Sequence, residues 1–113
     1  MKNIFQKIID REAPADFVYE DESFIVIKDI HPKAPIHLLI IPKKHIATVQ
    51  EIEEDDLPLM GEMVKIAQDM AKKFKIDKTG YRLLFNHGPH SGQIVPHLHL
   101  HLMGGAPLVR VTE

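Results

Sequence analysis

The sequence predicts an α+β fold in which a five-stranded antiparallel sheet is accompanied by one long and one short helix. Apolar residues recur at helical spacing near the N-terminus and again between residues 55 and 74, whereas five other runs have strand character. The order is helix, three strands, helix, two strands, and in the last run three histidines alternate with three leucines. This order favours an antiparallel sheet that the long helix covers on one face.

The composition is that of one globular domain, residues 1–113. Hydrophobic residues make up 44% of the chain, charged residues make up 27%, and the net charge is −2. We therefore expect no nucleic acid and no membrane as partner, and a cytoplasmic protein, because the chain has neither an apolar run of ~18 residues nor a secretory signal. The absence of cysteine excludes disulfides, thiol nucleophiles and cysteine-containing zinc sites, so chemistry depends on histidine, carboxylates or amides.

The first predicted helix is short, begins after Asn3, an acceptable N-cap, and precedes a turn around residues 13–14. Its apolar positions share one face and are Ile4, Phe5, Ile8 and Ile9. Strands are predicted at residues 17–19 and 23–28, separated by a charged turn, and at 36–41, just before a proline. The first two of these strands are expected to pair as antiparallel neighbours.

The long amphipathic helix is predicted to begin near Asp55 or Asp56, with Pro58 in its first turn. Its apolar stripe consists of Met60, Met63, Val64, Ala67, Met70, Ala71 and Phe74. Gly61 inside this pattern lowers helix stability by up to ~1 kcal/mol relative to alanine. Its presence indicates close packing against a neighbour, for which a second subunit is a candidate.

The last two predicted strands cover residues 81–86 and 97–102, and a loop containing glycine and proline joins them. Successive side chains of a strand point to opposite faces, so the three leucines of the last strand face the core and the three histidines face away from it. The outer histidines, His97 and His101, would lie about 13 Å apart at their Cα atoms. The three rings are therefore expected to differ in role.

Three interpretations of this histidine row are open on the residues alone. A metal site would combine two of the row with His37 or His45, since imidazole binds zinc, copper, iron and nickel. Nucleophilic catalysis would let one imidazole attack phosphorus, while a backbone N–H at Gly92 and the amide of Gln93 bind the phosphate. Burial and adjacent imidazoles would keep the middle ring neutral near pH 7. The row could also be a polar surface without chemistry.

The run at residues 97–103 resembles the signature of the histidine triad (HIT) family, in which three histidines alternate with apolar residues. The similarity covers roughly residues 4–105, and its other matching positions are 28–30, 34–37, 41–45, Asn86, Gly92, Gln93, Gly104 and Gly105. The pattern is most similar to the Hint branch, the purine nucleoside phosphoramidases. The resemblance implies a HIT-like fold and a hydrolase or transferase that cleaves bonds to the α-phosphate of purine nucleoside phosphoramidates or related nucleotides.

The resemblance also implies catalytic roles for four histidines. His99 would be the nucleophile and would form a nucleotidyl-histidine intermediate that water hydrolyses. His101 would contact the phosphate and assist proton transfer. His97 would orient the nucleophile, chiefly through its backbone carbonyl, and His37 would support the site. Neither a metal nor another cofactor is implied.

For the substrate, the resemblance implies a purine nucleotide whose ribose binds Asp29, because a carboxylate can accept hydrogen bonds from both hydroxyls. Asn86, Gly92 and Gln93 match the phosphate site. The residues that match the purine pocket are Ile4, Phe5, Ile8, Ile27 and Ile30. Family members form homodimers whose sheets join across a two-fold axis with the long helix at the interface, so we expect a homodimer.

One position departs from the Hint pattern. Many members carry a serine or another polar residue where this chain has Ile94, and isoleucine cannot help to protonate a departing amine. Two alternatives therefore stay open, namely hydrolysis of dinucleoside polyphosphates, as in the Fhit branch, and a non-catalytic nucleotide-binding module. Segments after the triad can influence the pocket in this family, and here they correspond to residues 109–113.

The remaining histidines are expected to have minor roles. His31 is predicted at the surface, and His45 is predicted to belong to a turn. His87 and His90 are placed in the loop that faces the site, where they could screen phosphate charge.

Overall fold

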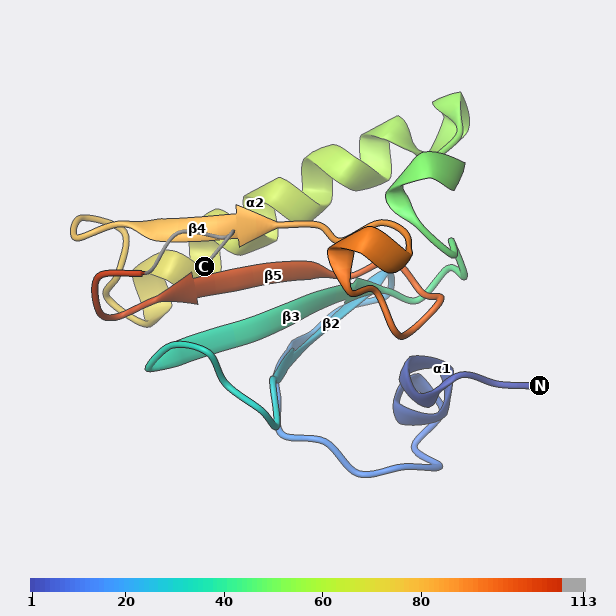
Figure 1. Ribbon diagram of the computed structural model, residues 1–113, viewed down its shortest axis with the longest axis horizontal. Coiled ribbons are helices and arrows are strands. Elements are labelled where there is room, and N and C mark those ends of the chain that lie inside the picture. Colours follow the sequence, from blue (N-terminus) through green and yellow to red (C-terminus); the bar gives the residue numbers. More distant parts are fainter. Residues whose placement is uncertain (109–113) are drawn as a thin grey trace.

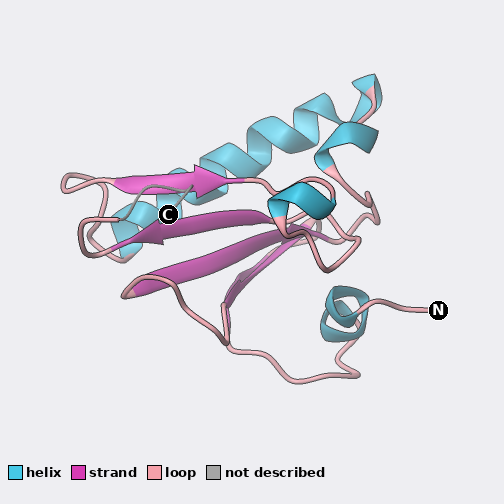
Figure 2. Ribbon diagram, in the orientation of Figure 1, coloured by secondary structure: helices cyan, strands magenta, loops and turns pink. Residues whose placement is uncertain are grey.

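The computed structural model describes residues 1–108 and confirms the predicted fold class (Figures 1 and 2). Five strands form one sheet in the order β1-β2-β3-β5-β4, and all neighbouring pairs are antiparallel. The strands are β1 (Phe17–Glu20), β2 (Phe24–Lys28), β3 (Ile36–Pro42), β4 (Tyr81–Leu84) and β5 (Leu100–Gly104). The helices are α1 (Ile4–Ile9) and α2 (Leu57–Lys73), and single 3-10 turns cover Val49–Glu51, Glu54–Asp56 and Pro89–Ser91. The segment 109–113, expected to influence the pocket, lies outside the described residues.

The two helices pack on opposite faces of the sheet (Figure 1). A strand directs successive residues to opposite faces, so each strand contributes to both cores. The core under α2 includes Met63, Ala67, Met70, Val26, Ile40 and Leu102. The smaller core under α1 consists of Phe5, Ile8, Ile25, Ile27, Leu39 and Ile41. Because α1 is only six residues long, much of this second face is left to the candidate site.

Helix α2 begins at Leu57, slightly later than predicted, because the preceding turn Glu54–Asp56 is a 3-10 helix. Met63 and Met70 are buried, so they pack within the chain. Gly61 differs, because a Cβ added to it would meet no heavy atom within 4 Å. The close packing expected at Gly61 is therefore not found inside residues 1–108. None of the helices in this part of the chain is long and apolar enough to span a membrane.

The histidine strand starts later than predicted. β5 covers Leu100–Gly104, so of the three histidines only His101 belongs to it, and the predicted span 97–102 is wrong at both ends. The reason at its start is a change of hydrogen-bond partner, since the N–H of Leu98 donates to the carbonyl of Ile46, outside the sheet. The predicted alternation nevertheless holds, because all three leucines lie in the core under α2.

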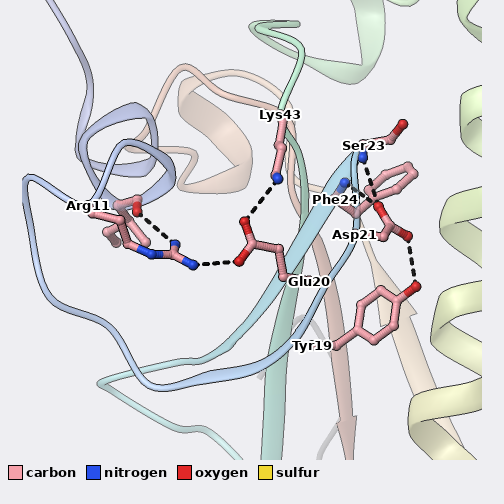
Figure 3. A network of polar contacts seen from close by, with 8 residues as sticks. Arg11, Tyr19, Glu20, Asp21, Ser23, Phe24 and Lys43 are labelled. Carbon is pink, nitrogen blue, oxygen red and sulfur yellow. Dashed lines mark hydrogen bonds and ion pairs between the residues drawn. The ribbon is translucent and has the colours of Figure 1, made fainter.

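A network of polar contacts joins the segment after α1 to the sheet (Figure 3). Glu20, at the end of β1, pairs with both Arg11 and Lys43. Asp21 accepts hydrogen bonds from two backbone N–H groups and so closes the turn between β1 and β2. Exposed ion pairs such as these contribute little stability individually. Together the two ion pairs of Glu20 fix the chain before and after residues 13–15, and these residues form one wall of the candidate site.

Candidate active site

The face of the sheet beside α1 forms a cleft with a volume of about 710 Å³. Helix α1, residues 13–15, the end of β2 and two loops form its walls, while β3, β4 and β5 contribute to its floor. Every site residue predicted from the sequence lines this cleft except His97. These lining residues are Ile4, Phe5, Ile8, Ile27, Asp29, Ile30, His37, Asn86, Gly92, Gln93, His99 and His101.

One end of the cleft is apolar. Phe5 and Ile8 from α1 and Ile27 from β2 belong at the same time to the smaller core and to the lining. Ile30 is 83% exposed and lies at the rim. Apolar walls combined with a few polar groups are typical of small-molecule sites. This end suits a flat, largely apolar ring.

The ring of His99 has a free lone pair on Nε2. Its Nδ1 lies 2.7 Å from the carbonyl oxygen of His97. A carbonyl only accepts, so Nδ1 carries the proton and Nε2 keeps its lone pair in the neutral ring. Burial lowers the pKa of His99 below its usual range, which keeps the ring neutral at pH 7. Phe5 packs edge-on against His99, with the ring centres 4.9 Å apart.

His97 is fully buried and lies outside the cleft lining. Its Nε2 is 2.8 Å from the carbonyl oxygen of Pro42, so Nε2 carries the proton. Its Nδ1 is 3.3 Å from the side-chain amide nitrogen of Asn3, which donates to it. Burial lowers the pKa of His97 as well. Both ring nitrogens of His97 thus have partners other than His99. His97 forms its hydrogen bond with the ring of His99 through its backbone carbonyl.

A second series of hydrogen bonds orients His101. The backbone N–H of Lys33 donates to Nδ1 of His37 over 3.0 Å, so the proton of His37 is on Nε2. This Nε2–H donates to Nδ1 of His101 over 2.9 Å, which leaves the proton of His101 on Nε2. His101 therefore offers a donor where His99 offers a lone pair. The two ring centres are 5.0 Å apart.

The pKa of His101 is lowered to about 4, chiefly by burial and in addition by the neighbouring His99 and His37. Burial also lowers the pKa of His37. The imidazoles of the site are thus neutral at pH 7. The sequence predicted a neutral middle ring from burial and from adjacent imidazoles. Burial is what lowers the pKa of His99, whereas neighbouring imidazoles contribute to the lowering at His97 and His101.

Asp29 lies next to His37 at the polar end of the cleft. Its Oδ1 accepts from the backbone N–H of His31 over 2.8 Å, and its Oδ2 is 3.4 Å from Nε2 of His37. Ligand atoms of Asp29, His37 and His101 lie within 4.8 Å of one another, a spacing at which a metal could bind. The Lys33 N–H occupies Nδ1 of His37, however, so Nε2 keeps its proton and lacks the lone pair that a metal needs. The donor set favours a hydrogen-bonded network over a metal site.

The loop that carries Gly92 and Gln93 is braced internally. The amide nitrogen of Gln93 donates to the carbonyls of Ala47 and Val95, and its amide oxygen accepts from the N–H of Gly88. This differs from the expectation that the Gln93 side chain donates to a bound phosphate. Gly92 has a φ of +84°, a left-handed conformation that glycine adopts without strain. The loop thus keeps its shape through Gln93 and turns at Gly92.

Asn86 and Ile94 also line the cleft. The side-chain amide of Asn86 lies 3.4 Å from Nε2 of His101. Because Nε2 carries the proton of the neutral ring, the amide must turn its oxygen towards it to accept that hydrogen bond. Ile94 lines the cleft and is 90% exposed. The side chain at position 94 is a hydrocarbon and cannot transfer a proton to a leaving group.

Comparisons with known proteins agree on the family. A family model described as "Scavenger mRNA decapping enzyme C-term binding" matches residues 2–107. An uncharacterized HIT-like protein of Chlamydia trachomatis is 54% identical over 108 residues, which is 96% of either chain. The purine nucleoside phosphoramidase of Escherichia coli K12 is 44% identical over 107 residues, or 95% of this chain and 90% of that protein. The chain belongs to the histidine triad family.

Two solved structures support the same assignment for the fold. The HIT family hydrolase from Legionella pneumophila Philadelphia 1 superimposes with a TM-score of 0.93 and is 44% identical, with 96% of each chain covered. The HIT family hydrolase from Clostridium thermocellum has a TM-score of 0.92 and 48% identity, and covers 96% of this chain and 95% of its own. The five-stranded antiparallel sheet of this HIT protein is therefore the fold of its family.

Sequence reasoning missed three groups that orient the histidines of this HIT protein. They are the N–H of Lys33, the carbonyl of Pro42 and the side-chain amide of Asn3. The first two are backbone groups that almost any residue type would supply, so no residue pattern marks them. Asn3 was predicted only as an N-cap. The signal that was available is that an asparagine cap, unlike serine or aspartate, has an NH₂ group left over.

The remaining histidines of this HIT protein lie as follows. His31 is exposed, as predicted, and it also lines the cleft. His45 binds the carbonyl of Pro96 over 2.9 Å and lies against the ring of buried His97. His87 binds Thr48 over 2.7 Å. Neither His87 nor His90 is among the residues lining the cleft, contrary to the expectation that they face the site.

Proposed function

We propose that this HIT protein hydrolyses purine nucleoside phosphoramidates, or related bonds to the α-phosphate of a purine nucleotide, through a nucleotidyl intermediate on His99. One observation carries the proposal: two neighbouring rings with centres 5.0 Å apart offer opposite groups, a lone pair on Nε2 of His99 and an N–H on Nε2 of His101. One group can attack phosphorus while the other supplies a proton. The names of the E. coli phosphoramidase and of the Legionella hydrolase support the same class of activity.

The cleft suits a nucleotide that extends from α1 towards β5. The purine would occupy the apolar end between α1, β2 and Ile30. The carboxylate of Asp29 would accept hydrogen bonds from the ribose hydroxyls. The α-phosphate would then lie against His99 and His101, with the amide of Asn86 beside it.

In the first step, the lone pair on Nε2 of His99 attacks the α-phosphorus, and the bond from phosphorus to the leaving nitrogen breaks. His101, which the charge of the bound phosphate brings into its protonated form, gives the proton on Nε2 to the departing group, which leaves as a neutral amine. The ring of His99 gains positive charge as its bond to phosphorus forms. The hydrogen bond from its Nδ1–H to the carbonyl of His97 strengthens with that charge and stabilises the intermediate.

In the second step, water attacks the phosphorus of the nucleotidyl-histidine. His101, now neutral, accepts a proton from this water. The bond between phosphorus and Nε2 of His99 breaks, and its electron pair returns to the ring. A nucleoside monophosphate leaves, and both histidines regain their starting states.

The low pKa of His101, about 4, is compatible with a role as acid once substrate is present. A bound phosphate places negative charge beside the ring, and an opposite charge favours the protonated form. The pKa of His101 is therefore expected to rise on binding. His101 is thus expected to be protonated when substrate is bound, which is when the leaving group needs a proton.

The test is intact-mass spectrometry during turnover of an adenosine 5′-phosphoramidate. We expect a transient adenylyl adduct on the wild-type chain and no adduct or turnover with His99→Gly. His90→Gly is the matched control, because His90 does not line the cleft. Equal turnover by His99→Gly would refute the mechanism.

The same assay separates the alternatives. Faster turnover of a diadenosine polyphosphate than of the phosphoramidate would replace the proposed substrate class. Tight binding of a purine nucleotide by calorimetry, with no turnover of either compound, would leave a binding module in place of an enzyme. The binding measurement is needed because the exposed side chain of Ile94 cannot transfer a proton to a leaving group.

We also propose that the chain forms a homodimer through the outward face of α2. Leu57 and Val64 are 57% and 46% exposed, and with Gly61 they form a stripe at helical spacing. The open space around Gly61 would admit a partner helix at short distance. Light scattering should give twice the chain mass, and Gly61→Leu should shift it towards the monomer. A monomeric wild-type protein at assay concentration would refute this.

A further inference from the structure

The side-chain amide of Asn3 makes two hydrogen bonds of different kinds. Its Oδ1 accepts from the backbone N–H of Gln6 over 2.8 Å, which caps α1, and its Nδ2 is 3.3 Å from Nδ1 of His97. A backbone N–H only donates, so the amide oxygen must face Gln6 and the NH₂ group must face His97. The cap thus determines what the amide offers to the triad.

The ring of His97 is held at both nitrogens. The carbonyl of Pro42 requires a proton on Nε2, and the NH₂ group of Asn3 requires a lone pair on Nδ1. One neutral tautomer satisfies both partners. Since His97 is fully buried, water is not at hand to replace either of them. Its carbonyl, held in place with the ring, is the group that orients His99.

Helix α1 meets the triad a second time through Phe5. The ring of Phe5 packs edge-on against His97 and His99, with centre distances of 6.1 and 4.9 Å. A helix of six residues is too short to be stable by itself, so contacts with the sheet must place it. The first turn of α1 therefore forms part of the apolar end of the cleft and also supports two of the histidines.

We propose that Asn3 is a positioning residue for the reaction: its side-chain N–H holds His97 in one tautomer and thereby fixes the carbonyl that orients His99. The inference rests on the proposed role of His99 as nucleophile. Without this donor, a buried acceptor on His97 is unpaired, and the ring can change tautomer or take up a proton. The carbonyl of His97 then loses its fixed position, and the Nδ1–H of His99 loses a well-placed acceptor.

Asn3→Ser tests the donor apart from the cap, because the single oxygen of serine can cap the helix but the shorter side chain has no second polar atom in the place of the NH₂ group that faces His97. We expect kcat to fall about fivefold, the effect of one neutral hydrogen bond, while KM stays near the wild-type value. Gln6→Ala is the matched control. It removes the reciprocal capping bond to the N–H of Asn3 and leaves the contact with His97, so kcat should be unchanged.

Asn3→Asp adds a pH readout. Aspartate also caps the helix, but it places a carboxylate against the lone pair on Nδ1 of His97. This favours the imidazolium, so the pKa of His97 rises and the acid limb of the kcat profile moves to higher pH. The ring otherwise faces His45 and His99, which lower the pKa of His97 and so act against this shift.

Nitrogen-15 spectra of the imidazole rings provide a readout that does not depend on turnover. The wild-type chain should have the proton of His97 on Nε2, and Asn3→Ser should shift its Nδ1 signal, whereas Gln6→Ala should not. Unchanged His97 signals together with unchanged kcat in Asn3→Ser would overturn the inference. If the wild-type chain hydrolyses nothing, the proposed function fails, and an unchanged His97 signal in Asn3→Ser would still refute the contact independently.

Discussion

Acidification should destabilise the fold through His101, and the variant His101→Gln should lack this effect. The pKa of the ring in the fold is about 4, against an ordinary value of 6.5, because burial and the neighbouring His99 and His37 disfavour its charged form. Lys33 acts in the same direction, and Asp29 opposes it. Between pH 6.5 and pH 4 the unfolded chain binds a proton at this position that the folded chain does not bind. The free energy of unfolding therefore falls as the pH is lowered through this window.

The size of the effect follows from the two pKa values. One pH unit of difference corresponds to ~1.4 kcal/mol, so the full loss at pH 4 is about 3 kcal/mol. The ring is partly open to solvent in the cleft, and solvent screening reduces this figure to about 2 kcal/mol. Glutamine can accept the proton that Nε2 of His37 donates and has an N–H of its own, but it does not titrate. His101→Gln should therefore keep the fold and remove this part of the pH dependence.

Urea unfolding followed by far-UV circular dichroism is the suitable assay, because the chain has no tryptophan. Both proteins are unfolded at pH 7 and at pH 4, and the loss in free energy of unfolding is compared. The carboxylates and the other histidines titrate in both proteins, so their contributions to the loss in free energy of unfolding cancel to first order in the comparison. The wild-type chain should lose about 2 kcal/mol more than the variant. Equal losses would refute the assignment of a low pKa to His101.

Three further perturbations test the site and the core. Lys33→Pro removes the N–H that donates to His37 and should lower kcat about fivefold, whereas Lys33→Ala keeps this N–H and should not. Leu102→Ala empties a fully buried position and should lower the free energy of unfolding by about 3 kcal/mol in urea titrations, whereas Leu83→Ala, at a part-exposed position, should have a much smaller effect. Gly92→Ala forces a side chain into a left-handed conformation at a cost of about 1 kcal/mol, so KM for nucleotide should rise; an unchanged KM would separate this turn from phosphate binding.

The alternation of histidine and leucine predicted the two faces of the chain correctly although the strand itself begins only at Leu100. The reason is that alternation needs an extended backbone and does not need a sheet partner. Pairing, by contrast, depends on which carbonyl lies opposite each N–H. The N–H of Leu98 finds the carbonyl of Ile46, a contact across the chain that no local pattern encodes.

The lining of the cleft could be predicted because the resemblance to the histidine triad family implies which positions of this chain line the site. The function of Gln93 could not be predicted in the same way. An amide is equally able to bind a phosphate and to brace a loop, and only the positions of Ala47, Val95 and Gly88 decide that it braces the loop. Gly61 is a similar case, because the space around it is visible only once the rest of the chain is placed.

The division of labour among the histidines has the same origin. Imidazoles of equal chemistry differ because the carbonyl of Pro42 sets the proton on His97 and the carbonyl of His97 sets the proton on His99. The N–H of Lys33 sets the proton on His37 and, through that ring, the proton on His101. These are backbone groups, so their positions depend on the course of β3 and of the adjoining loops and not on side-chain identity. A substitution that spares every histidine can therefore still exchange donor for acceptor in the site. For this reason the backbone contacts of His37 and His97 are as much a part of the proposed mechanism as the ring that attacks phosphorus.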